Sequence, residues 1–247
     1  MTSDISDHSR PAAASFVERQ ASIDLFLAAV SAELAAHPVR RLLDLGCGTG
    51  ALTLALAERF PDMEIVGLDI SAPNIAEADR RLALAGYGGR VSFVAADFFS
   101  WQGPLFDAIV TDGVLHLIPA TDAALFEKLA HHVAPGGYTL ITMPVADTGN
   151  AARVGLRKVW RAMPKALDEV ALSVAQRVYP KESREVLRDR VGYLRVLPER
   201  LWGTALQATA ERAGLVVERQ SSWPNPSVMK LQHGLIKLRR AGSAGAD

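Results

Sequence analysis

Alternating glycines near the start of the chain, preceded by an acidic residue, predict a ligand-binding turn. The three glycines occupy every second position of 46–50, and Asp44 precedes the first of them by two residues. Leucines in 42–45 predict a short buried strand, and 51–59 holds strong helix formers without Gly or Pro. A strand, a glycine turn and a helix bring backbone N–H groups up to a ligand, which the Asp44 carboxylate can also reach.

Three further acids stand at or near the ends of later predicted strands. They are Asp69 in 64–70, Asp97 in 91–97 and Asp112 in 106–113. Asp69 lies 19 positions after Gly50, and an acid about 20 residues after such a turn accepts both ribose hydroxyls of a nucleoside. Because parallel strands end at one edge of a sheet, the four acids are expected to converge there.

Two classes of ligand fit such a turn. Residues 46–51 match the loose dinucleotide pattern G-x-G-x-x-G/A, and 44–50 match the acidic-x-G-x-G-x-G motif in full. Asp44 would repel a pyrophosphate but attract the ammonium group of S-adenosylmethionine. On these residues the chain resembles the class I S-adenosylmethionine-dependent methyltransferases, over 40–145 and, less fully, over 199–240.

The resemblance implies a set of cofactor contacts at the sheet edge. The acid and glycines of 44–50 would seat the methionine portion, Asp69 would hold the ribose, and Asp97 with Phe98 would hold the adenine. The residues expected at the cofactor are Asp44, Gly46, Cys47, Gly48, Gly50, Asp69, Ile70, Asp97, Phe98 and Asp112.

In the resembling family, the loop that matches 114–119 passes under the reactive methyl group. His116 is a candidate general base there. A structural contact of His116 with the cofactor or the neighbouring backbone is an equally good interpretation, because many such enzymes work by proximity and orientation. Residues 112–115 lack the Asn/Asp-Pro-Pro-aromatic tetrad of enzymes that methylate base amino groups. No metal is expected. A catechol-type metal site through Asp112 would need an Asp-Asn pair after the fifth strand, and the sequence has no such pair there.

Alternating strand and helix patterns predict an α/β fold with a doubly wound, mainly parallel seven-stranded sheet. The last strand is expected to be antiparallel, and a helical cap is expected after the fifth strand. Helices are predicted over 15–36, 122–133 and 199–213. The expected organisation is an N-terminal tail and lid helix in 1–38, a core in 39–145 and 199–240, a cap in 146–198 and a disordered tail in 241–247.

The expected cap is basic, since residues 151–200 hold 12 Lys/Arg against 6 Asp/Glu. Arg153, Arg157, Arg161 and Lys165 step by four along one helix face. A solvated face is the favoured interpretation of this ladder. The alternative is a surface that attracts an anionic substrate.

Composition is that of an ordinary globular chain. Its 247 residues are 49% hydrophobic and 22% charged, with no net charge. No apolar run approaches the roughly 20 residues of a membrane helix, and the N-terminus lacks the features of a signal peptide. The lone cysteine, Cys47, forms no disulfide framework, so a cytoplasmic setting without membrane or nucleic-acid partners is expected.

These features predict an enzyme that transfers a methyl group from S-adenosylmethionine to an oxygen or nitrogen of a small molecule. An anionic substrate is expected somewhat more than a cationic one. Two alternatives remain open: an NAD(P)-dependent oxidoreductase on the same kind of fold, which Asp44 disfavours, and a member that binds the cofactor without methylating.

Overall fold

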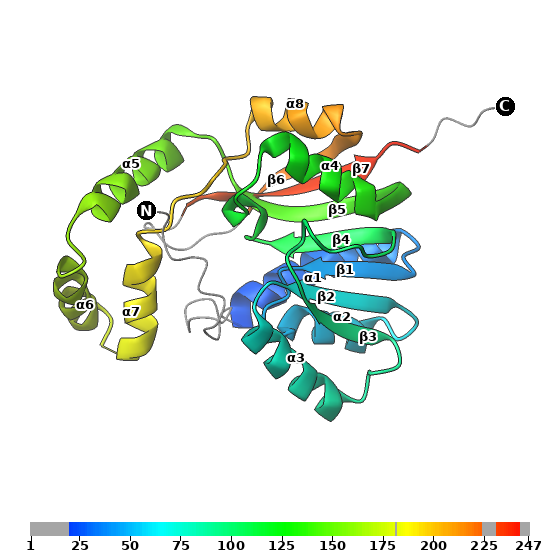
Figure 1. Cartoon of the computed structure of the whole chain (residues 1–247), viewed down its shortest axis with the longest axis horizontal. Coiled ribbons are helices and arrows are strands. Elements are labelled where there is room, and N and C mark those ends of the chain that lie inside the picture. Colours follow the sequence, from blue (N-terminus) through cyan, green and yellow to red (C-terminus); the bar gives the residue numbers. More distant parts are fainter. Residues whose placement is uncertain (1–19, 181, 224–230, 243–247) are drawn as a thin grey trace.

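Figure 1 shows the computed structural model, a seven-stranded sheet with helices on both faces. The structure describes residues 20–180, 182–223 and 231–242. The strands are β1 (Arg41–Leu45), β2 (Glu64–Asp69), β3 (Val91–Ala95), β4 (Phe106–Asp112), β5 (Val133–Pro144), β6 (Leu215–Trp223) and β7 (His233–Arg240). The helices are α1 (Gln20–Ala36), α2 (Ala51–Arg59), α3 (Ala72–Ala85), the 3-10 turn η1 (Leu115–Leu117), α4 (Asp122–His132), α5 (Thr148–Ala162), α6 (Leu167–Val178), α7 (Arg184–Tyr193) and α8 (Thr204–Arg212).

The strand order is β3-β2-β1-β4-β5-β7-β6. Strands β1 to β5 run parallel to one another, and β7 runs antiparallel to both β5 and β6. This confirms the predicted doubly wound, mainly parallel sheet with an antiparallel last strand. The chain winds outward from β1 toward β3 and then from β4 toward β6. The reversal of order between β1 and β4 is where sheets of this kind bind their ligands.

Each face of the sheet has its own hydrophobic core. Successive residues of β5 point to opposite faces, so Leu140 packs in the cluster with α1 and α2, while Ile141 packs in the cluster with α4 and α8. Both side chains are fully buried. Burial on both faces explains why these strands read as continuous apolar runs.

Helices α5, α6 and α7 occupy the stretch between β5 and α8 and project beyond the C-terminal ends of the parallel strands (Figure 1). The Asn150 side-chain amide ties the start of α5 to the sheet, donating to the carbonyls of Val145 at 2.7 Å and Gln232 at 2.8 Å. Pro164 falls between α5 and α6, so the long helical pattern divides at that residue.

The helix expected over 199–213 is shorter than predicted and begins at Thr204. Trp202 instead pairs its backbone with the end of β5: its N–H donates to the Pro144 carbonyl and its carbonyl accepts from the Ala146 N–H, both at 2.7 Å. This tertiary pairing removes the preceding residues from the helix, although their sequence is compatible with one.

Strand β5 begins at Val133, directly after α4, so the Pro-Gly-Gly sequence of 135–137, which would be expected to form a turn, lies inside the strand. Gly136 takes a left-handed φ of 77° there, which a residue without Cβ adopts at no steric cost. The predicted N-terminal helix corresponds to α1 from Gln20 onward. Residues 1–19 of the expected N-terminal tail and helix, and residues 243–247 of the tail expected over 241–247, lie outside the described residues.

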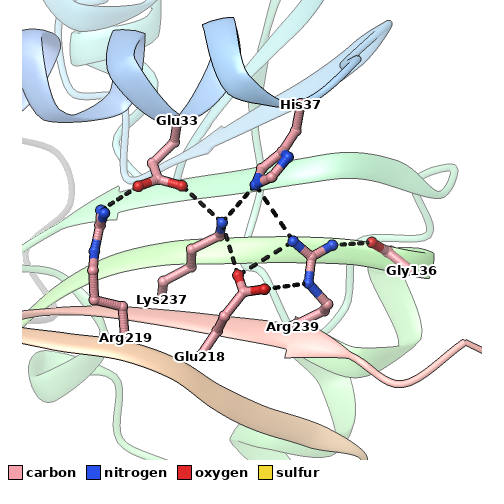
Figure 2. A network of polar contacts seen from close by, with 7 residues as sticks. All are labelled: Glu33, His37, Gly136, Glu218, Arg219, Lys237 and Arg239. Atoms are coloured by element: carbon pink, nitrogen blue, oxygen red, sulfur yellow. Dashed lines mark hydrogen bonds and ion pairs between the residues drawn. The ribbon is translucent and has the colours of Figure 1, made fainter.

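A charged network joins α1 to the antiparallel corner of the sheet (Figure 2). The Lys237 ammonium, 5% exposed, lies 2.7 Å from both the Glu33 and Glu218 carboxylates and 2.8 Å from His37 Nε2. Arg219 pairs with the other Glu33 oxygen, and Arg239 pairs with Glu218 at 2.8 Å. Burial alone would raise the pKa of Glu33, but Lys237 and Arg219 outweigh it and hold that pKa below its usual value.

Candidate functional site

All three glycines of the turn after β1 adopt left-handed backbone conformations, with φ of 79°, 54° and 79° at Gly46, Gly48 and Gly50. A Cβ on Gly46 would lie 2.4 Å from Val114, and one on Gly50 would lie 2.6 Å from Phe93. A Cβ on Gly48 would meet no atom within 4 Å. The outer glycines are therefore required by packing as well as by φ, while the middle one faces open space where a ligand can approach the backbone.

Asp44 is buried beneath this turn, and its carboxylate accepts a 2.6 Å hydrogen bond from Thr53 Oγ1. Burial raises its pKa to about 7, the charges of Asp69 and Asp112 add to that rise, and the Thr53 hydrogen bond opposes it. No cation balances Asp44 within the described ranges of the chain. A ligand that brings a positive charge would supply the missing partner and favour the ionised carboxylate.

Asp69, at the end of β2, fixes the turn from the adjacent strand. One carboxylate oxygen accepts from the Gly48 N–H at 2.9 Å and the other accepts from the Ser71 N–H at 2.8 Å. Each oxygen retains a second lone pair, and the residue is half-buried. Asp69 can therefore hold the turn and still accept hydroxyl groups from a ligand.

The predicted adenine contacts lie beyond β3. Asp97 is exposed, and one of its oxygens accepts from the Ser100 N–H at 3.1 Å. Phe98 is buried, with its ring centroid 5.8 Å from that of His132, so stacking of Phe98 on an adenine ring stays a prediction. Ile70, by contrast, is 45% exposed beside Asp69 and offers apolar surface at the same edge.

Cys47 lies within the glycine turn, and its side chain is buried rather than presented to a ligand. Burial raises the pKa of the Cys47 thiol, and the nearby Asp44 and Asp69 carboxylates raise it further. The thiol therefore stays protonated and is not a nucleophile. Its backbone N–H donates to the Leu68 carbonyl at 3.1 Å, which joins the turn to β2.

At the end of β4, Asp112 accepts a short hydrogen bond from Thr142 Oγ1, and the same hydroxyl accepts from the Gly113 N–H at 2.8 Å. The register aligns Asp44 with Val110, so Asp112 lies two residues further toward the C-terminal edge. Asp44, Asp69, Asp97 and Asp112 thus come from four neighbouring strands and the loops that follow them, as the sequence predicts.

His116 follows in η1 and is 1% exposed. Burial lowers its pKa to about 3, and the charges of His233, Arg157 and Arg200 lower it further. Neither ring nitrogen has a hydrogen-bond partner within the described ranges. The imidazole is neutral at physiological pH and is a weak base, so its role as a general base stays a prediction.

Arg200 organises the loop that carries His116, a role not apparent in the sequence. Its buried guanidinium donates to the carbonyls of Leu115, of Ile118 at 2.9 Å and of Ala120 at 2.6 Å, and it pairs with Asp122 at 2.9 Å. Nothing in the sequence distinguishes Arg200 from the other arginines nearby. Its partners lie some 80 positions away along the chain, and only the fold brings them together.

The basic ladder over 153–165 is only in part the solvated face that the sequence favoured. Arg157 is 4% exposed; it donates to the Val196 carbonyl at 3.2 Å, and its guanidinium carbon lies 5.0 Å from the Tyr193 ring centroid. Arg153 is half-buried, whereas Arg161 and Lys165 are exposed. Arg157 Nε is buried without a hydrogen-bond partner in the described residues. The interpretation is therefore wrong at Arg157, because α5 turns this polar residue inward.

No group of three or more His, Cys, Asp or Glu side chains in the described ranges is placed to hold a metal ion. None of the helices there is long and apolar enough to cross a bilayer. The arrangement at the strand ends is an acid-lined edge over a glycine turn, which suits a cationic nucleoside ligand such as S-adenosylmethionine.

Comparison with known proteins points to the same ligand. Residues 42–137 match the family described as the methyltransferase domain. A trans-aconitate 2-methyltransferase from Acidovorax sp. (strain JS42) is 38% identical over 141 residues, which cover 56% of this chain and 46% of that protein. A trans-aconitate 2-methyltransferase from Streptomyces avermitilis is 36% identical over 45% of this chain and 41% of its own length. The matches therefore span less than half of these curated relatives.

Solved structures share the fold over nearly the whole chain. Magnesium protoporphyrin IX methyltransferase from Synechocystis PCC 6803, with bound SAH, aligns with a TM-score of 0.60 at 17% identity, covering 90% of this chain and 83% of that one. The N-methyltransferase NodS from Bradyrhizobium japonicum WM9, in complex with S-adenosyl-L-homocysteine, aligns with a TM-score of 0.53, covering 84% and 81%. Residues 42–137 thus match a methyltransferase domain, and nearly the whole chain shares the fold of these methyltransferases of known structure.

Proposed function

We propose that the protein transfers the methyl group of S-adenosylmethionine to an oxygen or nitrogen atom of a small molecule. The observation that carries the proposal is the convergence of four strand-end acids around a turn whose three glycines are all left-handed. One of these acids, Asp44, is buried without a cationic partner in the described residues. When bound, the cofactor supplies an electrophilic methyl group activated by its positive sulfonium.

Different residues bind different parts of the cofactor. Asp44 binds the ammonium group of the methionine portion, and the Gly48 backbone leaves space beside it. Asp69 accepts the ribose hydroxyls with the lone pairs that its bonds to the backbone leave free. Asp97 accepts from the adenine amino group, and Ile70 offers the exposed apolar surface beside Asp69.

Catalysis follows mainly from alignment. The protein places the nucleophile in line with the bond to be broken and excludes water, which converts a bimolecular step into an effectively unimolecular one. A histidine with a pKa of about 3 is a poor proton acceptor at neutral pH. His116 accordingly contributes more to the shape of the loop than to proton transfer.

The charge of Arg157 on α5 supports an anionic substrate, because this guanidinium lies close enough to His116 to help lower the pKa of that side chain. Arg157 is buried, and its Nε–H donates no hydrogen bond to any of the described residues. A guanidinium with a free N–H suits a carboxylate. The relatives named above are specified as acting on trans-aconitate, a carboxylate. We therefore propose small carboxylates as the substrate class of this chain and name no individual compound. A cytoplasmic setting and the lack of nucleic-acid partners stay predictions.

The test is a methyl-transfer assay with the full chain and a panel of small carboxylic acids, alcohols and amines. Mass spectrometry should find a product about 14 mass units heavier than one of the acids, together with S-adenosylhomocysteine. The Asp69→Ala variant is the control, because it should lose turnover through the cofactor site alone. Release of S-adenosylhomocysteine without any heavier product, across the whole panel, would count against a small-molecule acceptor.

A further inference from the structure

Helices α5 and α6 expose an unusually apolar face. Eight large apolar side chains between 156 and 179 are more than a third exposed, and most are more than half exposed. They are Leu156 (58%), Val159 (54%), Met163 (38%), Leu167 (37%), Val170 (59%), Val174 (52%), Val178 (61%) and Tyr179 (53%). We call this set the α5–α6 stripe.

The stripe lies on the sides of both helices that face away from the rest of the protein. On α6, Leu172 is 1% exposed and lies on the side packed against α7, whose Leu187 and Val191 are also buried. Positions two residues either side of Leu172 point to the opposite side of a helix with 3.6 residues per turn, and Val170 and Val174 occupy them. In Figure 1, α6 lies further from the sheet than α7 does.

On α5 the usual arrangement of an amphipathic helix is inverted. Arg157 and Asn150 are buried on the side that meets the rest of the chain, while Leu156 and Val159 are exposed. A surface helix normally turns its apolar side to the core. The exposed apolar side of α5 therefore has no explanation within the described part of this chain.

The stripe is large enough for a stable interface. Eight side chains at these exposures present roughly 700 Å² of surface, more than the ~300–600 Å² of the largest patch on a typical monomer and close to the ~800 Å² that each partner buries in a standard protein interface. The stripe also lies outside the acid-lined edge, so an occupant would leave the cofactor residues free.

The sequence of α6 is self-complementary when two copies run antiparallel. The stripe positions 167, 170, 174 and 178 are nearly symmetric about a point between residues 172 and 173, so an axis there pairs the outer two and, to within one residue, the inner two. The same axis sets Glu169 beside Arg177 of a second copy. Both side chains are exposed, and Arg177 has no ion-pair partner among the described residues. Glu169 pairs with Arg184 at 2.9 Å but remains 61% exposed.

From this area and symmetry we infer that the α5–α6 stripe binds a second copy of this chain, with the two α6 helices antiparallel about a two-fold axis near Ser173. Closed two-fold pairs are the commonest protein assemblies and require a self-complementary patch. Charge at the rim sets register and orientation, while the apolar centre supplies the affinity. Binding of the stripe to a bilayer surface is the alternative that an experiment with anionic vesicles tests.

Sedimentation velocity of the full chain tests the inference. The protein should sediment as a dimer at micromolar concentration, and Val170→Asp/Val174→Asp should raise the dimer dissociation constant at least about a hundredfold. Leu84→Asp is the matched control, because Leu84 is 78% exposed on α3, far from the stripe, and should leave the dimer intact. Circular dichroism melts should show both variants folded.

Charge reversal separates a second copy from any other occupant. Glu169→Arg should weaken the dimer about tenfold, and adding Arg177→Glu should restore it, since opposite charges again meet across the axis. Within one chain Glu169 pairs with Arg184 of α7 and not with Arg177. If Glu169 acted only within its own chain, Arg177→Glu would therefore not restore the dimer. A wild-type monomer throughout the concentration series would overturn the inference, as would a monomer that sediments with anionic vesicles. A dimer indifferent to both sets of variants would overturn it too.

Discussion

Replacing Asp44 with Asn tests whether this buried carboxylate binds the positive end of the cofactor. Burial, together with the charges of Asp69 and Asp112, raises its pKa to about 7. A cationic ligand requires the ionised form, so below that pKa each unit of pH should weaken the binding of S-adenosylhomocysteine by about tenfold. Asp44→Asn should bind about 2–3 kcal/mol more weakly at neutral pH and show no such pH dependence.

Calorimetric titration between about pH 5.5 and 7 measures this slope directly. Repeating it in two buffers of different protonation enthalpy counts the protons released, and about one per ligand is expected near pH 6. Thr53→Val is an informative companion. It removes the hydrogen bond that holds the Asp44 pKa down, so the midpoint of the pH dependence should move upward. A pH-independent wild-type dissociation constant, or an Asn variant of equal affinity, would refute the reasoning.

The same pKa predicts an opposite effect on the stability of the ligand-free chain. Because the folded pKa of Asp44 lies above its ordinary value of 3.8, the folded state holds an extra proton between these two values. The stabilising contribution is complete below the unfolded pKa and is lost as pH rises through about 7. Asp44→Asn should therefore raise the Tm by a few degrees at about pH 8, while it weakens ligand binding. An unchanged or lowered Tm in differential scanning calorimetry would contradict this.

Three further predictions concern other residues. Asp69→Ala should weaken S-adenosylhomocysteine binding by about 2–3 kcal/mol in calorimetry, and an unchanged dissociation constant would remove Asp69 from the site. Arg157→Met should raise KM for a carboxylate substrate about tenfold with cofactor affinity unchanged; the exposed Lys158→Met is its control, and equal KM values in both would exclude Arg157 from substrate binding. Lys237→Met should lower the free energy of unfolding by about 3 kcal/mol in urea titrations, because it leaves the Glu33 carboxylate buried without its buried cationic partner, and a loss below about 0.5 kcal/mol would show that the network is not stabilising.

The Glu33 and Glu218 carboxylates also set how the protein responds to acid. Lys237 and Arg219 lower the pKa of Glu33, and Arg239 with Lys237 lowers the pKa of Glu218 to about 2. Groups with depressed pKa values contribute stability above their ordinary pKa of 4.5 that is lost as pH falls through the folded value. The part of stability due to this network should therefore vanish between about pH 4.5 and pH 2.

The sheet and its acid-lined edge are predictable from the sequence because their signals are local. A buried strand, a glycine turn and an acid at a fixed distance each occupy a few residues, and parallel strands bring their ends together whatever the details of packing. The positions of Asp44 and Asp69 follow in this way. The dual role of Asp69 does not, because its carboxylate accepts from the N–H of Gly48, which lies in the turn after the neighbouring strand.

The parts that escape prediction depend on contacts between distant residues. Helical spacing shows that Arg157 shares a face with other basic residues, but not that Val196 and Tyr193 cover it. The sequence around Trp202 is compatible with a helix, but in the fold its backbone pairs with Pro144. The sequence places His116 in a loop, but it does not show that the fold buries this side chain beside His233. In each case tertiary packing overrides local preference.

Titration of the full chain with S-adenosylhomocysteine and, separately, with NAD at neutral pH tests the central claim most directly. Asp44 sits beneath the turn where a pyrophosphate would lie, and it has no cation beside it in the described residues. We predict micromolar or tighter binding of S-adenosylhomocysteine, lost in Asp69→Ala, and no measurable binding of NAD. Tight binding of NAD with no heat from S-adenosylhomocysteine would contradict the assignment of this edge to a methyltransferase cofactor.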